Sequence, residues 1–139
     1  MSRFLDTNVL LYSISTESRE AVKRRIAVRL LEERDNVLSV QVLQEFYVQA
    51  TRPTRRDPLQ HDIAVGLIRT WLRFPVQELT LAVMGHALDL KARLPLSYWD
   101  AAIVAAAHIS GCTELMSEDM AHGSAIDGLR ITNPFRAQR

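Results

Sequence analysis

Hydrophobic residues along the chain occur in two patterns: short continuous runs, and longer stretches in which they recur at helical spacing. The short runs predict buried strands at residues 3–5, 36–40, 76–79, 112–117 and 129–132. The longer stretches predict helices directly after residue 6 and at residues 18–34, 42–50, 59–73, 80–94 and 99–109. Because strands alternate with helices, we expect an α/β fold with a short, mainly parallel sheet flanked by helices.

Polar residues and glycines separate these elements. Ser18, Thr80 and Ser97 stand where helix N-caps are expected. The region around Gly123 and Gly128 is predicted to be a loop. The helix at residues 99–109 is apolar on almost every side, so we expect it to be fully buried.

The composition is that of one folded domain, which we expect to span residues 1–139. The 139 residues are 47% hydrophobic and 24% charged, enough for one core and too few for two ordinary domains. Cys112 is the one cysteine and cannot form an internal disulfide. No apolar run resembles a secretory leader or could span a bilayer, so we expect a cytoplasmic protein outside the membrane.

Four acidic residues fall at one edge of the predicted sheet. Asp6 follows the first strand directly, and Glu45 lies in the opening turns of the helix after the second strand. Asp119 lies just past a later strand, and Asp100 lies in the first turn of the helix that leads into that strand. Because ligands of parallel α/β sheets bind beyond the carboxyl ends of the strands, we expect these side chains to converge there.

Clustered carboxylates repel one another and need protons or cations to neutralise them. Oxygen ligands without paired His or Cys favour Mg²⁺ or Mn²⁺, and such ions can hold a phosphodiester and activate a water. The cluster therefore predicts metal-dependent phosphodiester hydrolysis, with metal-binding or catalytic carboxylates at Asp6, Glu45, Asp100 and Asp119. Neighbouring polar side chains are expected to orient them, namely Thr7, Asn8 and Ser117.

Each acid also has a structural explanation on its own. Asp6 is a good cap for the next helix, and Ser97 and Asp100 have the spacing of a capping box. Glu45 suits a solvated helix face, and Asp119 suits a turn. Their joint placement at one edge favours a functional site.

Four sequence motifs resemble those of the PIN domain family, and most closely those of bacterial VapC-type toxins of toxin–antitoxin pairs. The motifs are FLDTNVLLY at 4–12, SVQVLQEFY at 39–47, SYWDAAIVAAA at 97–107 and LMSEDM at 115–120. The resemblance covers nearly the whole chain and implies the PIN fold, an endoribonuclease activity that uses Mg²⁺ or Mn²⁺, and an RNA substrate. It also implies a homodimer and a cognate antitoxin that covers the active site.

The resemblance assigns the four acids as metal ligands or catalytic carboxylates. Ser117 stands where the family often has Thr, which keeps the hydroxyl. Glu118 makes the fourth motif ambiguous, because adjacent Glu118 and Asp119 cannot both point into one site from a regular backbone. We choose Asp119 by its spacing from Ser117.

Basic residues and histidines are less specific. The net charge is only +1, but all but two of the 17 basic residues are Arg, which suits phosphate contacts; genomic base composition explains the count equally well. The candidates for contacts with RNA are Arg52, Arg55 and Arg56, with a solvated charged surface as the alternative. The histidines show no paired ligand spacing, although His122 lies close enough to Asp119 to touch a substrate.

Two other function classes remain open from the sequence. An acid-rich α/β phosphatase or a receiver domain would use a similar edge, but the phosphatase motif wants a second Asp where this chain has Asn8, and a receiver wants an upstream acidic pair. A PIN module that binds RNA or protein without cutting is the second alternative. Clustered negative charge facing phosphate gives no advantage to binding alone, which argues against it.

Overall fold

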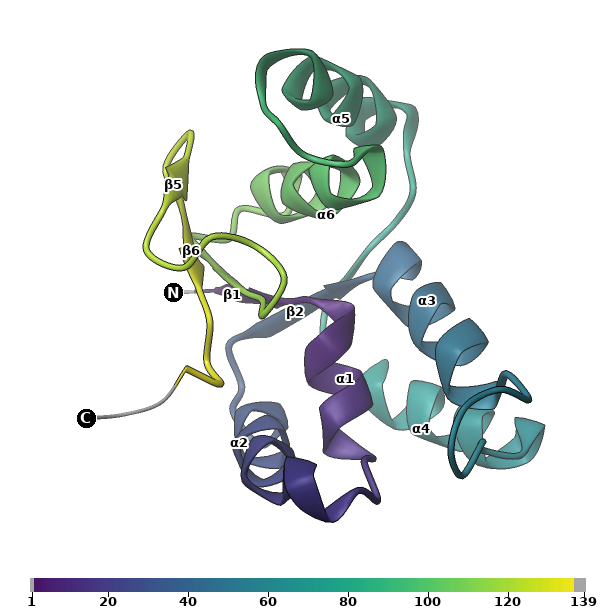
Figure 1. Ribbon diagram of the computed structural model, residues 1–139. Coiled ribbons are helices and arrows are strands. Elements are labelled where there is room, and N and C mark those ends of the chain that lie inside the picture. Colours follow the sequence, from purple (N-terminus) through teal and green to yellow (C-terminus); the bar gives the residue numbers. More distant parts are fainter. Residues whose placement is uncertain (1, 137–139) are drawn as a thin grey trace.

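In a computed structural model, which describes residues 2–136, the chain forms a six-stranded sheet flanked by helices (Figure 1). The strands are β1 (Arg3–Leu5), β2 (Asn36–Ser39), β3 (Val76–Gln77), β4 (Glu114–Met116), β5 (Ala125–Ile126) and β6 (Leu129–Thr132). Their order is β3-β2-β1-β4-β6-β5, and every pair is parallel except β5 and β6. The α/β class and the mainly parallel sheet expected from the sequence are confirmed.

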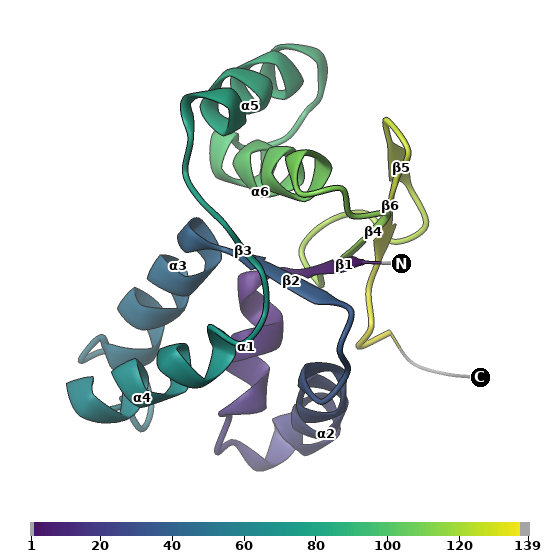
Figure 2. The ribbon, with the colours of Figure 1, turned by 180° about the vertical axis from the view of Figure 1, so that it is seen from behind.

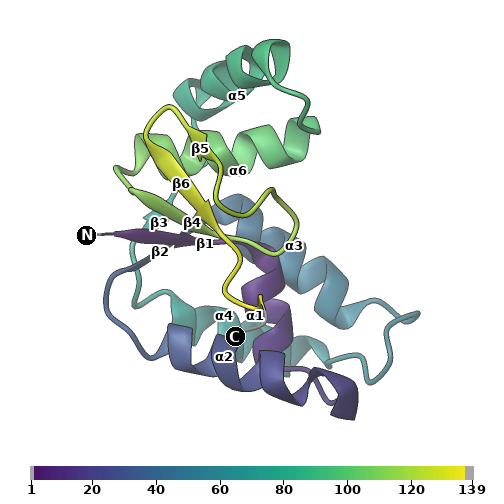
Figure 3. The same cartoon turned by 60° about the vertical axis from the view of Figure 1, so that its left-hand side comes forward.

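Helices cover the sheet on both sides (Figures 1 and 3). On one side lie α1 (Thr7–Ser13), α2 (Ala21–Leu31), α3 (Val40–Thr51) and α4 (His61–Trp71); on the other lie α5 (Leu81–Arg93) and α6 (Tyr98–Ile109). A 3₁₀ turn at Ser18–Glu20 leads into α2. The described helices include none long and apolar enough to cross a membrane.

The core forms where the helices meet the sheet, because the strands present apolar side chains to both layers. Phe4 and Leu115, on neighbouring strands, are fully buried, and Phe46 of α3 packs edge-to-face on Trp71 of α4 at 4.7 Å between ring centroids. Burial of such side chains contributes roughly 1.5–3 kcal/mol each. The ends of the strands are therefore held on a rigid support.

Helix starts follow the capping residues in the sequence with one exception. Thr80 accepts a hydrogen bond from the Val83 N–H, and Ser97 accepts one from the Asp100 N–H, as predicted. Ser18 is not an N-cap, because it lies inside the 3₁₀ turn and α2 begins only at Ala21. The Ser15 hydroxyl makes the local bond instead, donating to Glu20 at 2.6 Å.

Two other expectations differ from the structure. The predicted loop contains a β-hairpin, because Asp127 and Gly128 have positive φ and form the two-residue turn that joins β5 to β6. The helix α6 is not fully buried, because Trp99 at its start is 63% exposed. Several apolar residues within the predicted helices are likewise exposed, including Val22, Ile63, Leu72 and Leu88.

The strand order gathers the ends of three strands into one place. The strands β2, β1 and β4 are neighbours, so the chain leaves all three at adjacent points of the carboxyl edge. The connection from β1 to β2 passes through the α1 side, whereas the connection from β3 to β4 passes through α5 and α6 (Figure 2). The topology switches sides between β1 and β4, which is where ligands bind in open α/β sheets.

Candidate active site

Asp6 occupies the centre of this edge, as the N-cap of α1 directly after β1. Its side chain accepts hydrogen bonds from the Thr7 N–H at 2.7 Å and from the Ser117 hydroxyl at 2.6 Å. The residue is only 3% exposed. Asp6 thus caps α1, as considered from the sequence, but the cap uses only one of its carboxylate oxygens. The other oxygen accepts from Ser117, the residue that follows β4.

Glu45 is held on α3 by two neighbours. The Thr7 hydroxyl donates to one of its oxygens at 2.6 Å, and the Gln41 amide donates to the other at 3.2 Å. Gln41 also donates to the backbone carbonyl of Trp99 at 3.1 Å, which ties α3 to the start of α6. Glu45 is therefore fixed toward the cleft and is not a free, solvated helix residue.

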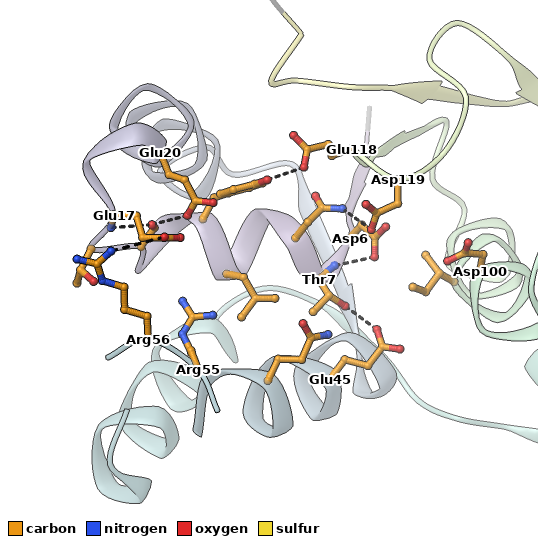
Figure 4. Close-up of a pocket in the computed structure, with 17 residues that line it drawn as sticks. Asp6, Thr7, Glu17, Glu20, Glu45, Arg55, Arg56, Asp100, Glu118 and Asp119 are labelled. Carbon is orange, nitrogen blue, oxygen red and sulfur yellow. Dashed lines mark hydrogen bonds and ion pairs between the residues drawn. The ribbon is translucent and has the colours of Figure 1, made fainter. Parts of the chain in front are cut away.

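Asp119 and Glu118 point in different directions. Asp119 is exposed, accepts from the Asn8 amide at 3.2 Å, and its backbone N–H donates to the Ser117 hydroxyl at 3.1 Å. Glu118 accepts from the Tyr12 hydroxyl and pairs with the Lys23 ammonium, each at 2.5 Å. Asp119 is thus the residue turned toward the other acids (Figure 4).

Asp100 approaches from the opposite layer, in the first turn of α6. Its pKa is raised by partial burial and by the charges of Asp119 and Glu45, and a hydrogen bond from Ser97 opposes the shift. The Ser97 hydroxyl caps α6 by accepting from the Asp100 N–H, as the capping-box spacing predicts, and Asp100 also lines the cleft. The four acids come from four distant segments and lie around one space (Figure 4).

The carboxylates of the cluster act on one another's pKa values. Burial raises the pKa of Asp6 to about 7, against the hydrogen bonds from Ser117 and Thr7, and the charges of Asp119 and Asp100 raise it further. A carboxylate accepting two hydrogen bonds would ordinarily titrate low. Removal from water, with a smaller contribution from the like charges, outweighs those bonds.

A cleft of about 440 Å³ contains all four acids. Thr7 and Asn8 line it with them, and Ser117 lies beneath, fully buried. Of the three arginines predicted to contact RNA, Arg55 and Arg56 line the cleft, whereas Arg52 is exposed outside it. The site residues expected from the sequence are therefore brought together, apart from Arg52.

The oxygen donors of the cleft suit a hard divalent cation, although the four carboxylates lie farther apart than ligands of one ion. Among residues 2–136 no three acidic, His or Cys side chains are grouped closely enough to hold an ion. Mg²⁺ usually takes only one or two carboxylates and completes its shell with water. Within the described part of the chain, the buried Oδ1 oxygen of Asn8 has no hydrogen-bond partner, although the Asn8 amide group donates to Asp119. Asn8 therefore has a further oxygen to offer.

Some residues play a different part from the one the sequence left open. His122 accepts a hydrogen bond from the Asn133 N–H at 3.0 Å and does not line the cleft. His108 contacts His86 at 2.9 Å and the Ile126 carbonyl at 2.8 Å, on the far side of α6. Gln41 was missed, and only its position four residues before Glu45, on the same helix face, could have indicated it.

Comparison with known proteins identifies the family. A model of the PIN domain matches residues 3–123, so the chain belongs to the PIN domain family. This confirms the resemblance found in the sequence motifs. No curated protein sequence matches the chain at a significant level.

Solved structures share the fold. One is a toxin–antitoxin complex from Klebsiella pneumoniae, with 20% identity, 98% of this chain and 100% of that chain covered, and a TM-score of 0.73. Another is VapC20 from Mycobacterium tuberculosis, described as a sarcin-ricin loop cleaving toxin, with 21% identity, 85% and 92% coverage and a TM-score of 0.66. DNA-bound VapBC from Salmonella typhimurium matches with 18% identity, 96% and 98% coverage and a TM-score of 0.66.

Proposed function

We propose that this PIN domain is an endoribonuclease that uses Mg²⁺ or Mn²⁺ to hydrolyse RNA phosphodiester bonds. The observation that carries the proposal is the acid cluster, in which four carboxylates from separate segments line one cleft. Burial raises the pKa of Asp6 to about 7, and the charges of Asp119 and Asp100 add to the shift. A fold accepts such repulsion where a cation relieves it. VapC20, which shares the fold, is described as a toxin that cleaves the sarcin-ricin loop, which supports RNA as the substrate class.

The residues of the cleft have two roles in this proposal, binding the ion and positioning the residues that bind it. Asp6, Asp100, Asp119 and Glu45 would hold the ion, which when bound activates a water and stabilises charge on the phosphate. Thr7 and Gln41 fix the two oxygens of Glu45, and each carboxylate oxygen retains a lone pair for a further partner. Ser117 links the carboxylate of Asp6 to the backbone of Asp119, so the two acids keep a constant separation.

A water nucleophile does not need the RNA 2′-hydroxyl. The products should therefore carry 5′-phosphate and 3′-hydroxyl ends. End-group analysis by enzymatic labelling checks this expectation. Products with 2′,3′-cyclic phosphate would indicate metal-free transesterification and would contradict the proposal.

Cleavage by purified protein in Mg²⁺, Mn²⁺ and EDTA tests the activity, with two variants as a matched pair. Asp100→Asn should abolish cleavage. Asp62→Asn should not, although Asp62 is also in the first turn of a helix, because Asp62 is not among the residues that line the cleft. If the two variants cleave equally, the four-acid site is wrong.

We further propose that the chain is the toxin of a type II toxin–antitoxin pair, acting in the cytoplasm as a homodimer that a cognate antitoxin inhibits. Structures of toxin–antitoxin complexes share its fold. Exposed apolar side chains on α4, at its C-cap and on α5 suit a protein with partners, namely Ile63, Leu72, Leu81, Met84 and Leu88. Expression in bacteria should arrest growth, and the Asp100→Asn variant should be harmless. Harmless, folded wild-type protein would refute the toxin role.

A further inference from the structure

The cleft that holds the acids extends well beyond them. Its lining follows α1 from Asp6, before the helix, to Ser15 and Thr16, past its end. Seven helical residues rise by roughly 10 Å, so the cleft is longer than one phosphate group. At the end away from Asp100 and Asp119, Arg55 and Arg56 face the space (Figure 4).

The cleft has few positively charged side chains, and the cations near it are mostly close to an acidic residue. Acidic residues outnumber the lining cations, which are Arg55 and Arg56 alone. Arg56 is largely exposed and lies 4.0 Å from Glu17. The nearby Lys23 is paired with Glu118 at 2.5 Å.

Arg55 differs from Arg56 and Lys23 in the contacts of its guanidinium. Among residues 2–136 its side chain makes no ion pair and no hydrogen bond, although the residue is half-buried. Its Nε atom is buried and unsatisfied. A buried N–H donor without an acceptor is costly. Glu20, which lines the same cleft, is already bonded to Ser15.

We propose that Arg55 is a binding site for a second backbone phosphate of the single-stranded RNA substrate, apart from the phosphate that is cut. A guanidinium binds phosphate through two parallel hydrogen bonds, which would satisfy the orphaned Nε. Anionic phosphate is otherwise repelled along this acidic cleft, so the strand should be anchored at this unpaired cation. The inference rests on the proposed nuclease function and names how the substrate is positioned.

Binding of short fluorescent oligoribonucleotides to the Asp100→Asn protein tests the proposal without cleavage. Adding Arg55→Met should weaken binding about tenfold or more, as expected for loss of a charged hydrogen bond. It should also reduce the slope of log Kd against log salt by about 0.7, one phosphate of a single strand. The control Arg52→Met removes an exposed cation outside the cleft. It should change the affinity and the salt slope less than Arg55→Met does.

Oligonucleotides with one methylphosphonate at a time identify the phosphate. A methylphosphonate at one position other than the scissile one should weaken binding by a similar factor. At that position, and at no other, combining the methylphosphonate with Arg55→Met should weaken binding no further than either change does by itself. Arg55→Lys should keep the salt slope but lose part of the affinity. Equal effects of Arg55→Met and Arg52→Met, or no sensitive non-scissile position, would overturn the proposal.

The same set of proteins distinguishes a folding defect, a failure of the nuclease proposal and a failure of the Arg55 proposal. If thermal melting shows that Arg55→Met is unfolded, the methylphosphonate scan on the parent protein decides alone. If the wild type binds RNA with this pattern but never cleaves, the nuclease proposal fails while the Arg55 subsite stands. If it cleaves and Arg55 has no effect, only the subsite fails.

Discussion

Replacing Asp6 with asparagine should stabilise the metal-free protein at neutral and higher pH. The carboxyl of Asp6 is buried, and its pKa rises from 3.8 to about 7 on folding. Between these two values the folded state keeps a proton that the unfolded state has lost. Stability must therefore fall as the pH rises, by about 1.4 kcal/mol per pH unit from this group.

The size of the effect follows from the same shift. Roughly three pH units at this slope amount to at most about 4 kcal/mol, present in full below the unfolded pKa and lost above pH 7. The introduced asparagine would keep an oxygen for the Thr7 N–H, and its amide could donate to the Ser117 hydroxyl. The Asp6→Asn variant should thus lose the cost of a buried charge and keep the helix cap.

Urea melts in EDTA at pH 5 and pH 8 measure the difference. Asp6→Asn should exceed the wild type by about 1–4 kcal/mol at pH 8 and by much less at pH 5. Saturating Mg²⁺ should close much of the gap, because binding at 100 times Kd stabilises the wild type by roughly 2.7 kcal/mol. A variant less stable than the wild type at pH 8 would show that Asp6 is chiefly a structural cap.

Three further variants probe other parts of the structure. Asp100→Asn should leave the metal-free protein as stable as before or more stable, with no cleavage; a loss of roughly 0.3–1 kcal/mol in urea melts would mark Asp100 as a mere dipole-stabilising residue. Lys23→Met leaves Glu118 without its cation, so the adjoining Asp119 loop should loosen and kcat should fall, with recovery in Lys23→Arg. Gly128→Ala meets a φ of +85° and should cost about 1 kcal/mol in thermal melts while cleavage stays intact, because the hairpin is remote from the cleft.

Most of the fold was predictable because short apolar runs alternate with longer helical stripes in this chain. Asp6 follows a short apolar run and Ser97 precedes a long apolar helix, so both positions at the sheet edge followed from local rules. Local rules do not predict the order of the strands in the sheet. It depends on how β1, β2 and β4 pack, which local patterns do not encode.

The hairpin was missed although a signal for it existed. Asp127 and Gly128 form one of the dipeptides most typical of a two-residue hairpin turn. The strand before it, β5, has only two residues, too few to show alternation. Turn chemistry was the better indicator here than hydrophobic pattern.

In the candidate site, residue types were easier to predict than their partners. The spacing from Ser117 was enough to choose Asp119 over Glu118, but the partners of Glu118 were not predictable. They are Tyr12 and Lys23, which lie 106 and 95 residues away from it in sequence. Gln41 was missed because a glutamine on a helix has no distinctive pattern; its role follows only from its contacts with Glu45 and the Trp99 carbonyl. Tertiary contacts of polar side chains are the part that the sequence leaves undetermined.

Cleavage of a defined single-stranded RNA by purified wild-type protein, with and without a chelator, tests the central claim most directly. The acid cluster predicts cutting in Mg²⁺ or Mn²⁺, none in EDTA, recovery when the ion is restored, and none with Asp100→Asn under any condition. Full activity in excess EDTA, or cleavage by Asp100→Asn at the wild-type rate, would contradict the proposed metal-dependent nuclease.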